Sequence, residues 1–271
     1  MNINIILIII LCIIFFNQNK IINIVEKYTA NNVEKYTANI VEKYTAIIVE
    51  PRKHKALELV LTNFLENLDD RWNFIIFHGL ENEIYIKNII QNKPQNNRIK
   101  LVNLNVKNLT IADYNKLFYS KFLYDNIPTE VFLVFQTDTL ICKKYKDLIY
   151  KFIKYDYVGA PWLPTSWNTP NCSKNNVGNG GLSLRKKSKM LELLNNCTHN
   201  NINEDQFFSK VICNCKYDVK LYKPSEIEAK EFAIEHIYNN KSFGVHKPWL
   251  YITENINFCD DLDKLIILNK K

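Results

Sequence analysis

The chain has little arginine, glycine or methionine, and its cysteines form no Cys-x-x-Cys pair. Arg occurs four times, Gly six times and Met twice in 271 residues. The net charge of +7 comes mainly from Lys spread singly along the chain, without an arginine-rich block or a basic run interleaved with aromatics. We therefore expect no nucleic-acid partner. The seven cysteines indicate neither a zinc ribbon nor a compact disulfide framework, and the redox compartment stays open.

The N-terminal apolar run, residues 5–16, is twelve residues long, short of the roughly 20 that span a bilayer as a helix. It has the length of a signal-peptide core, yet no Lys or Arg precedes it and residues 17–20 offer no small-residue cleavage site. An uncleaved anchor, a poor signal and a mis-called start codon are the alternatives. Membrane attachment through residues 1–16, with a location at the membrane or in the secretory-pathway lumen, is one expectation, and the cytoplasm is the other.

Three copies of Val-Glu-Lys-Tyr-Thr-Ala follow, beginning at Val25, Val33 and Val41. Their period of eight residues matches neither an α-helix nor a solenoid unit of about 20 to 50 residues. Three such short copies cannot build a core of their own. We therefore interpret residues 17–44 as a linker between segment 1–16 and a single domain, residues 45–271.

Beyond residue 45, short apolar runs alternate with stretches of helical periodicity. Strands are expected at 46–50, 72–79, 99–104 and 130–136, and helices at 53–68, 81–91 and 111–123. This β-α-β-α-β-α-β order predicts an α/β fold, with a mainly parallel sheet and helices on both faces. Ligands of such sheets bind outside the carboxyl ends of the strands, where the strand order switches. Residues that follow strands are thus the first candidates for a site.

The segment Gln136-Thr137-Asp138 follows the last of these strands. A carboxylate at the end of a buried strand is held in place by the sheet, and oxygen ligands suit Mg²⁺ or Mn²⁺. Asp138 is therefore a candidate metal ligand. The alternative is a helix or turn cap ahead of Leu140.

A glycine-rich segment, residues 177–181, holds three of the six glycines in four positions. Such a backbone either adopts unusual dihedral angles or allows close approach of a ligand, and its amides suit phosphate or sugar hydroxyls. It lacks Gly-Lys-Ser/Thr and does not open a helix after a first strand, which excludes Walker and dinucleotide-binding loops. A tight turn into a strand at 182–185 is the alternative.

Two later segments carry further candidates. Glu204 and Asp205 precede a helix expected to begin near Gln206, so they either complement the helix dipole or supply a general base. His246 lies in a segment that Pro248 keeps from being helical, and it is either a turn histidine packed on Trp249 or a functional one.

In this order the segments resemble the GT-A type of nucleotide-sugar-dependent glycosyltransferase, which has an acidic metal motif after a central strand, a glycine-rich loop, a Glu-Asp pair and a late histidine. More closely, strings between about residues 45 and 250 resemble an uncharacterised domain family of large DNA viruses and some microbes. These strings are Ile48-Val49-Glu50-Pro51-Arg52, Phe135-Gln136-Thr137-Asp138, Val158-Gly159-Ala160-Pro161-Trp162, Gly178-Asn179-Gly180-Gly181-Leu182-Ser183-Leu184-Arg185, Glu204-Asp205 and Gly244-Val245-His246-Lys247-Pro248-Trp249.

The resemblance implies a Rossmann-like GT-A architecture and a glycosyltransferase. Such an enzyme would move a sugar from a nucleoside-diphosphate donor to a glycan, protein or small-molecule acceptor, with Mn²⁺ or Mg²⁺ and with inversion. Asp138 and His246 would hold the metal, and Asp205 would take the acceptor proton beside Glu204. The donor or acceptor would contact five further residues: Arg52, Gln136, Trp162, Gly180 and Gly181.

One position departs from this pattern, because Gln136 stands where the first acid of the Asp-x-Asp motif is expected. Metal dependence is thereby open, and a catalytically inactive carbohydrate- or nucleotide-binding module of the same fold is the alternative function. A metal-dependent phosphoesterase would need more Asp and His ligands. Trp162 and Trp167 either offer apolar faces to sugar rings or form a packed loop cover.

Overall fold

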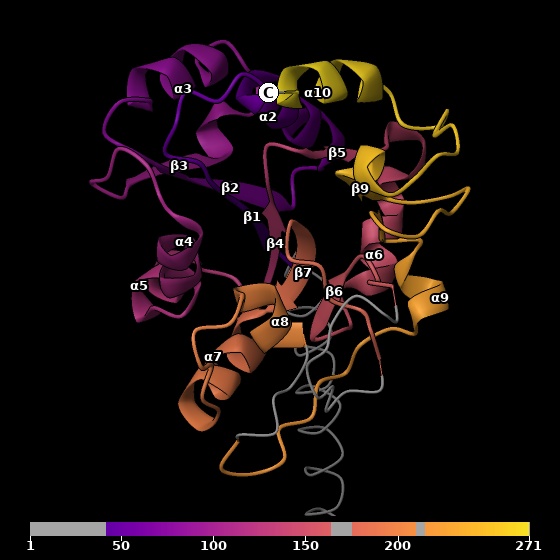
Figure 1. Ribbon diagram of the computed structural model, residues 1–271. Coiled ribbons are helices and arrows are strands. Elements are labelled where there is room, and N and C mark those ends of the chain that lie inside the picture. The colour runs from indigo at the N-terminus through magenta and orange to yellow at the C-terminus, as the bar shows by residue number, and fades with distance from the viewer. Residues whose placement is uncertain (1–41, 164–174, 210–214, 271) are drawn as a thin grey trace, which may run out of the picture. The chain divides into compact units, whose positions relative to one another are not determined.

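A computed structural model describes residues 42–163, 175–209 and 215–270 (Figure 1). The apolar run 5–16, the first two repeats and Trp167 lie outside the described residues, so the predictions made for them stay predictions. A compact unit begins at Lys43. In the described part of the chain, no helix is both long and apolar enough to cross a membrane.

The central sheet of the described residues has six strands in the order β3-β2-β1-β4-β7-β6. Neighbours among β3, β2, β1 and β4 pair in parallel, whereas β7 is antiparallel to both β4 and β6. The strands are β1 (Tyr44–Val49), β2 (Trp72–His78), β3 (Ile99–Asn103), β4 (Val131–Phe135), β6 (Tyr157–Gly159) and β7 (Leu182–Lys186). The mainly parallel α/β sheet predicted from the sequence is confirmed, and the last repeat supplies the first residues of β1.

Helices cover both faces of this sheet because successive strand residues point to opposite sides. Ala46 and Ile48 of β1 join one core cluster, and Ile47 and Val49 join the other. The first cluster includes residues of α2 (Leu57–Asn67), α3 (Glu83–Ile90), α6 (Ile149–Phe152), α9 (Glu226–Ala229) and α10 (Leu262–Asn269). The second includes residues of α4 (Ile111–Phe118), α5 (Lys121–Asn126), α7 (Lys187–Asn196) and α8 (Glu204–Ser209).

The order of the strands switches between β1 and β4. The chain runs outward from β1 through β2 to β3 and then returns to β4 on the other side of β1. The chain segments that follow β1 and β4 therefore leave the edge of the sheet in different directions, which leaves an opening between them. Glu50-Pro51-Arg52 and Gln136-Thr137-Asp138 lie at this edge, as expected from the sequence.

A second, small sheet continues from β4. Strands β5 (Thr139–Ile141), β9 (Gly244–His246) and β8 (Ala233–Ile234) form it in the order β5-β9-β8. Thr139 pairs with His246 in the antiparallel β5–β9 ladder, and β8 runs parallel to β9. This register carries the end of β9 to the start of β5, where Asp138 is. A short 3-10 turn, η3 (Pro248–Leu250), ends the segment, and others, η1 (Asn96–Arg98) and η2 (Lys143–Leu148), lie earlier.

The part of the chain that the structure describes contains two disulfides, Cys142–Cys259 and Cys197–Cys215. The sequence did not indicate them, because one pair is separated by 117 residues and neither spacing has a recognisable pattern. Cys142 directly follows β5, so the first bond ties the segment after β9 to the end of the strand that begins beside Asp138.

Two local predictions need correction. Helix α8 begins at Glu204 and not near Gln206, because the side chain of Asn115 accepts the backbone N–H of Glu204 at 3.1 Å and starts the helix two residues earlier. The expected single helix at 111–123 is two helices, since Ser120 has an extended backbone between α4 and α5.

Candidate active site

Two adjoining cavities lie at the switch between β1 and β4. The first cavity, of about 360 Å³, is lined by the loop after β1, the segment before α4, residues 136–138 and Lys247. The second cavity, of about 200 Å³, is lined by α4, the glycine-rich loop, the start of α8 and the end of β9. Ile111, Tyr114, Gln136 and Lys247 line both. The two cavities are thus halves of one cleft that meet at Gln136 and Lys247.

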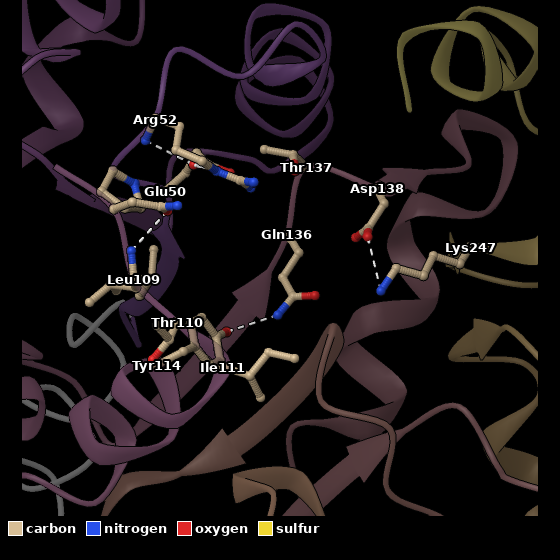
Figure 2. Close-up of a pocket in the computed structure, with 13 residues that line it drawn as sticks. Glu50, Arg52, Leu109, Thr110, Ile111, Tyr114, Gln136, Thr137, Asp138 and Lys247 are labelled. Atoms are coloured by element: carbon tan, nitrogen blue, oxygen red, sulfur yellow. Dashed lines mark hydrogen bonds and ion pairs between the residues drawn. The ribbon is translucent and has the colours of Figure 1, made fainter. Parts of the chain in front are cut away.

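Two side chains of the turn after β4, those of Gln136 and Asp138, have different partners. Figure 2 shows Gln136 turned toward Tyr114, whose hydroxyl accepts a hydrogen bond from Gln136 Nε2 at 3.0 Å. The Oδ2 atom of Asp138 lies 3.1 Å from Lys247 Nζ. Lys247 has a left-handed backbone, with φ of 42° and ψ of 42°, and its N–H donates to the carbonyl of Asp138. Both residues are therefore fixed at the junction of the cavities.

The register of the small sheet brings His246 to Asp138. His246 is 3% exposed, and its Nε2 lies 3.4 Å from Asp138 Oδ1. Its Nδ1 lies 3.0 Å from Oε1 of Glu235, which follows β8 and is 4% exposed. Oε2 of Glu235 lies 2.9 Å from His236 Nδ1. Two carboxylates thus face the two nitrogens of one buried imidazole.

These charges shift the pKa of each group. Burial would lower the pKa of His246, but Asp138 and Glu235 outweigh burial and raise it to about 9. Burial would raise the pKa of Glu235, but its hydrogen bond with His236 and the close approach of His246 outweigh burial and lower the pKa to about 2. Burial likewise opposes the charges of His246 and Lys247, which hold the pKa of Asp138 far below its ordinary value.

Asp138 and His246, which the sequence predicts as metal ligands, lie beside each other with bonding capacity left over. Asp138 Oδ1 and both ring nitrogens of His246 are buried and make no aligned hydrogen bond within the protein. A carboxylate oxygen and an imidazole nitrogen suit Mn²⁺. No cluster of three or more His, Cys, Asp or Glu ligands occurs among the described residues, so other ligands of such an ion would have to come from bound substrate or water.

Close packing, and not an unusual backbone conformation, is the reason for glycine at positions 180 and 181. None of the chain's glycines has a positive φ. A Cβ on Gly181 would lie 2.2 Å from His246 Nε2. A Cβ on Gly180 would lie 2.7 Å from both Asp205 Cβ and Glu204 Oε1. The loop therefore brings the histidine and the acidic pair to one wall of the second cavity.

Glu204 and Asp205, adjacent in sequence, have different surroundings. Glu204 is buried and forms a bidentate ion pair with Arg185 of β7, with Nη1–Oε2 at 2.5 Å and Nη2–Oε1 at 3.1 Å. Arg185 is 0% exposed and lies 4.9 Å from the ring centroid of Tyr157 and 5.1 Å from that of Phe118. The pair anchors the start of α8 to strand β7 of the sheet.

Asp205 keeps its carboxylate at the cavity wall. Its Oδ2 accepts the N–H of Gly180 at 3.2 Å, and its Oδ1 accepts the N–H of Gln206 at 2.8 Å. Desolvation first, and the neighbouring charge of Glu204 second, raise the pKa of Asp205 to about 7. A general base works best when its pKa is near the operating pH, so this carboxylate suits proton transfer.

Arg52 lies at the rim of the first cavity and folds back onto Glu50 (Figure 2). Its Nε and Nη2 donate to the two oxygens of Glu50, both at 2.8 Å. The Arg52 side chain is 53% exposed, whereas that of Glu50 is 4% exposed. The guanidinium therefore remains accessible to a ligand in the first cavity.

The structure does not bring Trp162 to the cleft. This tryptophan is 1% exposed and packs near Gly178, where an added Cβ would lie 3.2 Å from its ring. Of the two interpretations given for it, the packed loop cover is the one observed.

The sequence analysis did not single out three residues of the cleft and its wall: Glu235, Lys247 and Arg185. Glu235 and Lys247 become neighbours of His246 and Asp138 only through the pairing of β8, β9 and β5. The available signal for Lys247 was its place directly after His246, and that for Arg185 was its place within a segment expected to be a strand. Of the predicted residues, Asp138, His246, Gln136, Gly180, Gly181, Glu204 and Asp205 meet around the second cavity or its edge, and Arg52 lies in the first.

The fold and the site together define a Rossmann-like α/β protein with a ligand cleft at the carboxyl edge of its sheet, the arrangement that the GT-A resemblance implied. The chain belongs to the family described as protein of unknown function DUF5672, whose model matches residues 98–246. This confirms the resemblance to an uncharacterised domain family. No curated protein sequence matches the chain.

The fold is also similar to those of solved structures. Galactosyltransferase LgtC, in complex with donor and acceptor sugar analogs, is 10% identical with a TM-score of 0.48, covering 83% of this chain and 94% of LgtC. HddC from Yersinia pseudotuberculosis is 13% identical with a TM-score of 0.41, covering 64% of this chain and 88% of HddC. Mannosyltransferase PcManGT from Pyrobaculum calidifontis, in complex with GDP-Man and Mn²⁺, is 14% identical with a TM-score of 0.45. The match covers 62% of this chain and 50% of PcManGT.

Proposed function

We propose that this protein is a glycosyltransferase that moves a sugar from a nucleoside-diphosphate donor to a hydroxyl acceptor with inversion. The observation that carries the proposal is the meeting of two sets of groups in one cleft. Asp138, His246 and Lys247 lie where the cavities join, and Asp205 lies on the wall of the second cavity. The nucleotide then lies in the first cavity, the diphosphate at the junction and the transferred sugar in the second cavity.

The chemistry of transfer requires groups of this kind. A sugar leaves its nucleoside diphosphate while negative charge develops on the departing phosphate, and Lys247 and Arg52 are cations beside that path. When bound by Asp138 and His246, Mn²⁺ or Mg²⁺ supplies further positive charge that neutralises the diphosphate. Asp205 accepts the proton of the attacking hydroxyl, and its N–H contacts from Gly180 and Gln206 keep the carboxylate in place.

Asp205→Asn tests the catalytic assignment. A general base contributes about 10² to 10⁴ in rate, so transfer to an acceptor should fall by that order while donor binding remains. A helix-capping role would instead predict a loss of about 1 kcal/mol in stability with the turnover of the folded protein intact. Turnover and melting temperature of Asp205→Asn, with Glu204→Gln in parallel, separate the two roles. An unstable but active Asp205→Asn protein would refute the base.

Asp138→Asn tests the proposed metal ligand. We expect the variant to lose Mn²⁺ binding in calorimetry and to stay folded, since a residue at a strand end contributes little to core packing. His246→Ala should weaken Mn²⁺ binding without changing which nucleotide binds. Unchanged Mn²⁺ affinity in folded Asp138→Asn would remove this residue from the metal site.

A binding module that has lost catalysis is the second candidate, and Gln136 is the observation that favours it. The amide of Gln136 is engaged by Tyr114 and supplies no carboxylate at the position of the first motif acid. Hydrolysis of sugar nucleotides, measured with and without acceptors, distinguishes the two candidates. Binding without any turnover would support the module.

We also propose that the domain folds in an oxidising compartment, the secretory-pathway lumen, where residues 1–16 would provide attachment to the membrane. The two disulfides support this location, because such bonds persist in oxidising compartments and are rare in the cytosol. Peptide mapping of the unreduced protein from its native cell checks the proposal. Free thiols at Cys142 and Cys259 would contradict it.

A further inference from the structure

The second cavity has the size of a compartment for one sugar ring. Its volume is about 200 Å³, below the roughly 300 to 1,000 Å³ of pockets that hold drug-sized ligands. Its polar lining consists of amide and carboxyl side chains together with the backbone of Gly180 and Gly181, which suits a polyhydroxylated ring. Asn115, Asn203 and Asp205 are among the residues that line it.

The charges on this lining are predominantly negative. Three carboxylates line the cavity, those of Glu204, Asp205 and Glu235. Lys247 is the only Lys or Arg among the described lining residues, and its ammonium already lies 3.1 Å from Asp138. Any positive charge on His246 faces the carboxylates of Glu235 and Asp138.

The arginine nearest to this wall does not serve a ligand. Arg185 is fully buried behind Glu204, its guanidinium spans both Glu204 oxygens, and its Nε donates to Ser183 Oγ at 2.9 Å. It offers no contact to the cavity, whereas Asp205 presents a carboxylate with no cationic partner among the ion pairs of the described residues. Burial is the main cause of the raised pKa of Asp205, and the negative charge of Glu204 is the second, so Glu204 adds to the cost of a charged Asp205 at this wall.

We infer that the second cavity accepts an uncharged sugar and excludes acidic sugars such as uronic acids. This rests on the proposed function, since it assumes that a sugar nucleotide occupies the cleft. A uronic acid differs from its parent hexose by a carboxylate in place of one hydroxymethyl group. In this cavity that carboxylate would face like charges without a free Lys or Arg to pair with, and like charges at close range repel.

The test compares matched pairs of sugar nucleotides by calorimetry, with Mg²⁺ present throughout. UDP-glucose is compared with UDP-glucuronate, and GDP-mannose with GDP-mannuronate, with UDP and GDP alone as references. Within whichever pair binds, we expect the neutral sugar nucleotide to bind at least about tenfold more tightly than the acidic one. Equal or tighter binding of the acidic member would overturn the inference. If no nucleotide binds at all, the proposed function itself fails, and the inference with it.

A pair of variants locates the cause of the discrimination. Asp205→Asn removes one carboxylate from the cavity and should reduce the preference for the neutral sugar several-fold. Asp125→Asn changes the net charge by the same amount on the exposed surface of α5 and should leave the preference unchanged. If the preference is unchanged in Asp205→Asn, or falls equally in both variants, the charge of the second cavity does not set it.

Discussion

Each half of the cleft has one arginine–glutamate pair, and the two pairs differ mainly in burial. In the first cavity, Arg52 is 53% exposed while its partner Glu50 is buried. At the second cavity, both Arg185 and Glu204 are buried, at 0% and 5% exposure of their side chains. The bonding is similar in both, because each guanidinium spans two carboxylate oxygens.

Burial gives these similar pairs different roles. Water can replace an exposed arginine around its partner, so Arg52 is able to leave Glu50 for a phosphate at low cost. Arg185 has no such freedom, since separation would leave two buried charges without partners. The first pair is therefore suited to ligand binding, and the second to fixing the wall from which Asp205 projects.

Arg185→Met removes the arginine of the buried pair and should have the largest effect on stability. The variant leaves Glu204 buried and unpaired, so the free energy of unfolding should fall by about 3 to 5 kcal/mol. Urea denaturation measures this loss. The matched control is Arg52→Met, which removes the same charge from the exposed pair. Similar losses in both variants would show that burial does not distinguish the pairs.

Gly181→Ala should lower stability by about 1 to 3 kcal/mol and also weaken Mn²⁺ binding, because the new Cβ would overlap the His246 ring. Thermal unfolding and Mn²⁺ calorimetry report the two effects. Gly79→Ala is the control near the first cavity, where the Cβ would overlap the Pro51 carbonyl at 2.5 Å. It should lose stability with unchanged Mn²⁺ affinity. Adding His246→Ala should relieve the clash of Gly181→Ala, and a double variant less stable than the single one would argue against this cause.

The raised pKa of Asp205, in the second cavity, predicts that the stability of the protein depends on pH. Its pKa of about 7 lies above the ordinary value of 3.8, so the folded protein binds this proton more tightly than the unfolded chain does. The contribution of Asp205 to stability is therefore present at about pH 4 and is lost as the pH rises toward 7, by on the order of 1 kcal/mol or more.

Urea unfolding at pH 4 and pH 8 checks this sign. Relative to wild type, Asp205→Asn should become more stable at pH 8 than at pH 4, since the variant has no carboxylate to ionise. Asp125→Asn, on the exposed surface, serves as the control. A difference that does not change with pH would exclude the raised pKa.

Arg52→Met removes the arginine of the exposed pair and should have the smallest effect on folding. Its stability loss should stay within about 1 kcal/mol. Binding of a nucleoside diphosphate should nevertheless weaken about tenfold, because a charged hydrogen bond to the ligand is lost. Calorimetry with UDP and GDP provides the measurement, and unchanged affinity for the nucleotide that binds would remove Arg52 from the site.

The sequence predicted the position of the first cavity better than the arrangement of residues in the second. For the first cavity, the strands that end at Val49 and Phe135 were expected within one or two residues, and the structure shows that the strand order switches between them. Apolar runs and their spacing are local signals, and the rules for parallel sheets convert them into a position for the ligand site.

For the second cavity, the sequence identified candidate residues but not which of them contact one another in the folded protein. It pointed to Asp138, the glycines, Asp205 and His246 as separate segments, each with a plain structural alternative. Which alternative holds depends on contacts between residues far apart, such as Glu204 with Asn115 and Asn269 with the carbonyl of Thr137. Spacing along the chain does not encode such distances, so Glu235 and Arg185 were missed.

By itself, the amino-acid sequence determined the α/β class, the parallel strands and the edge of the sheet where the cleft opens, because these follow from hydrophobic periodicity. The tertiary structure decided which charges became buried and paired, which glycines had to remain small, and that Trp162 packs inside the protein. These outcomes depend on desolvation and close packing among distant segments, and both arise only when the chain has folded.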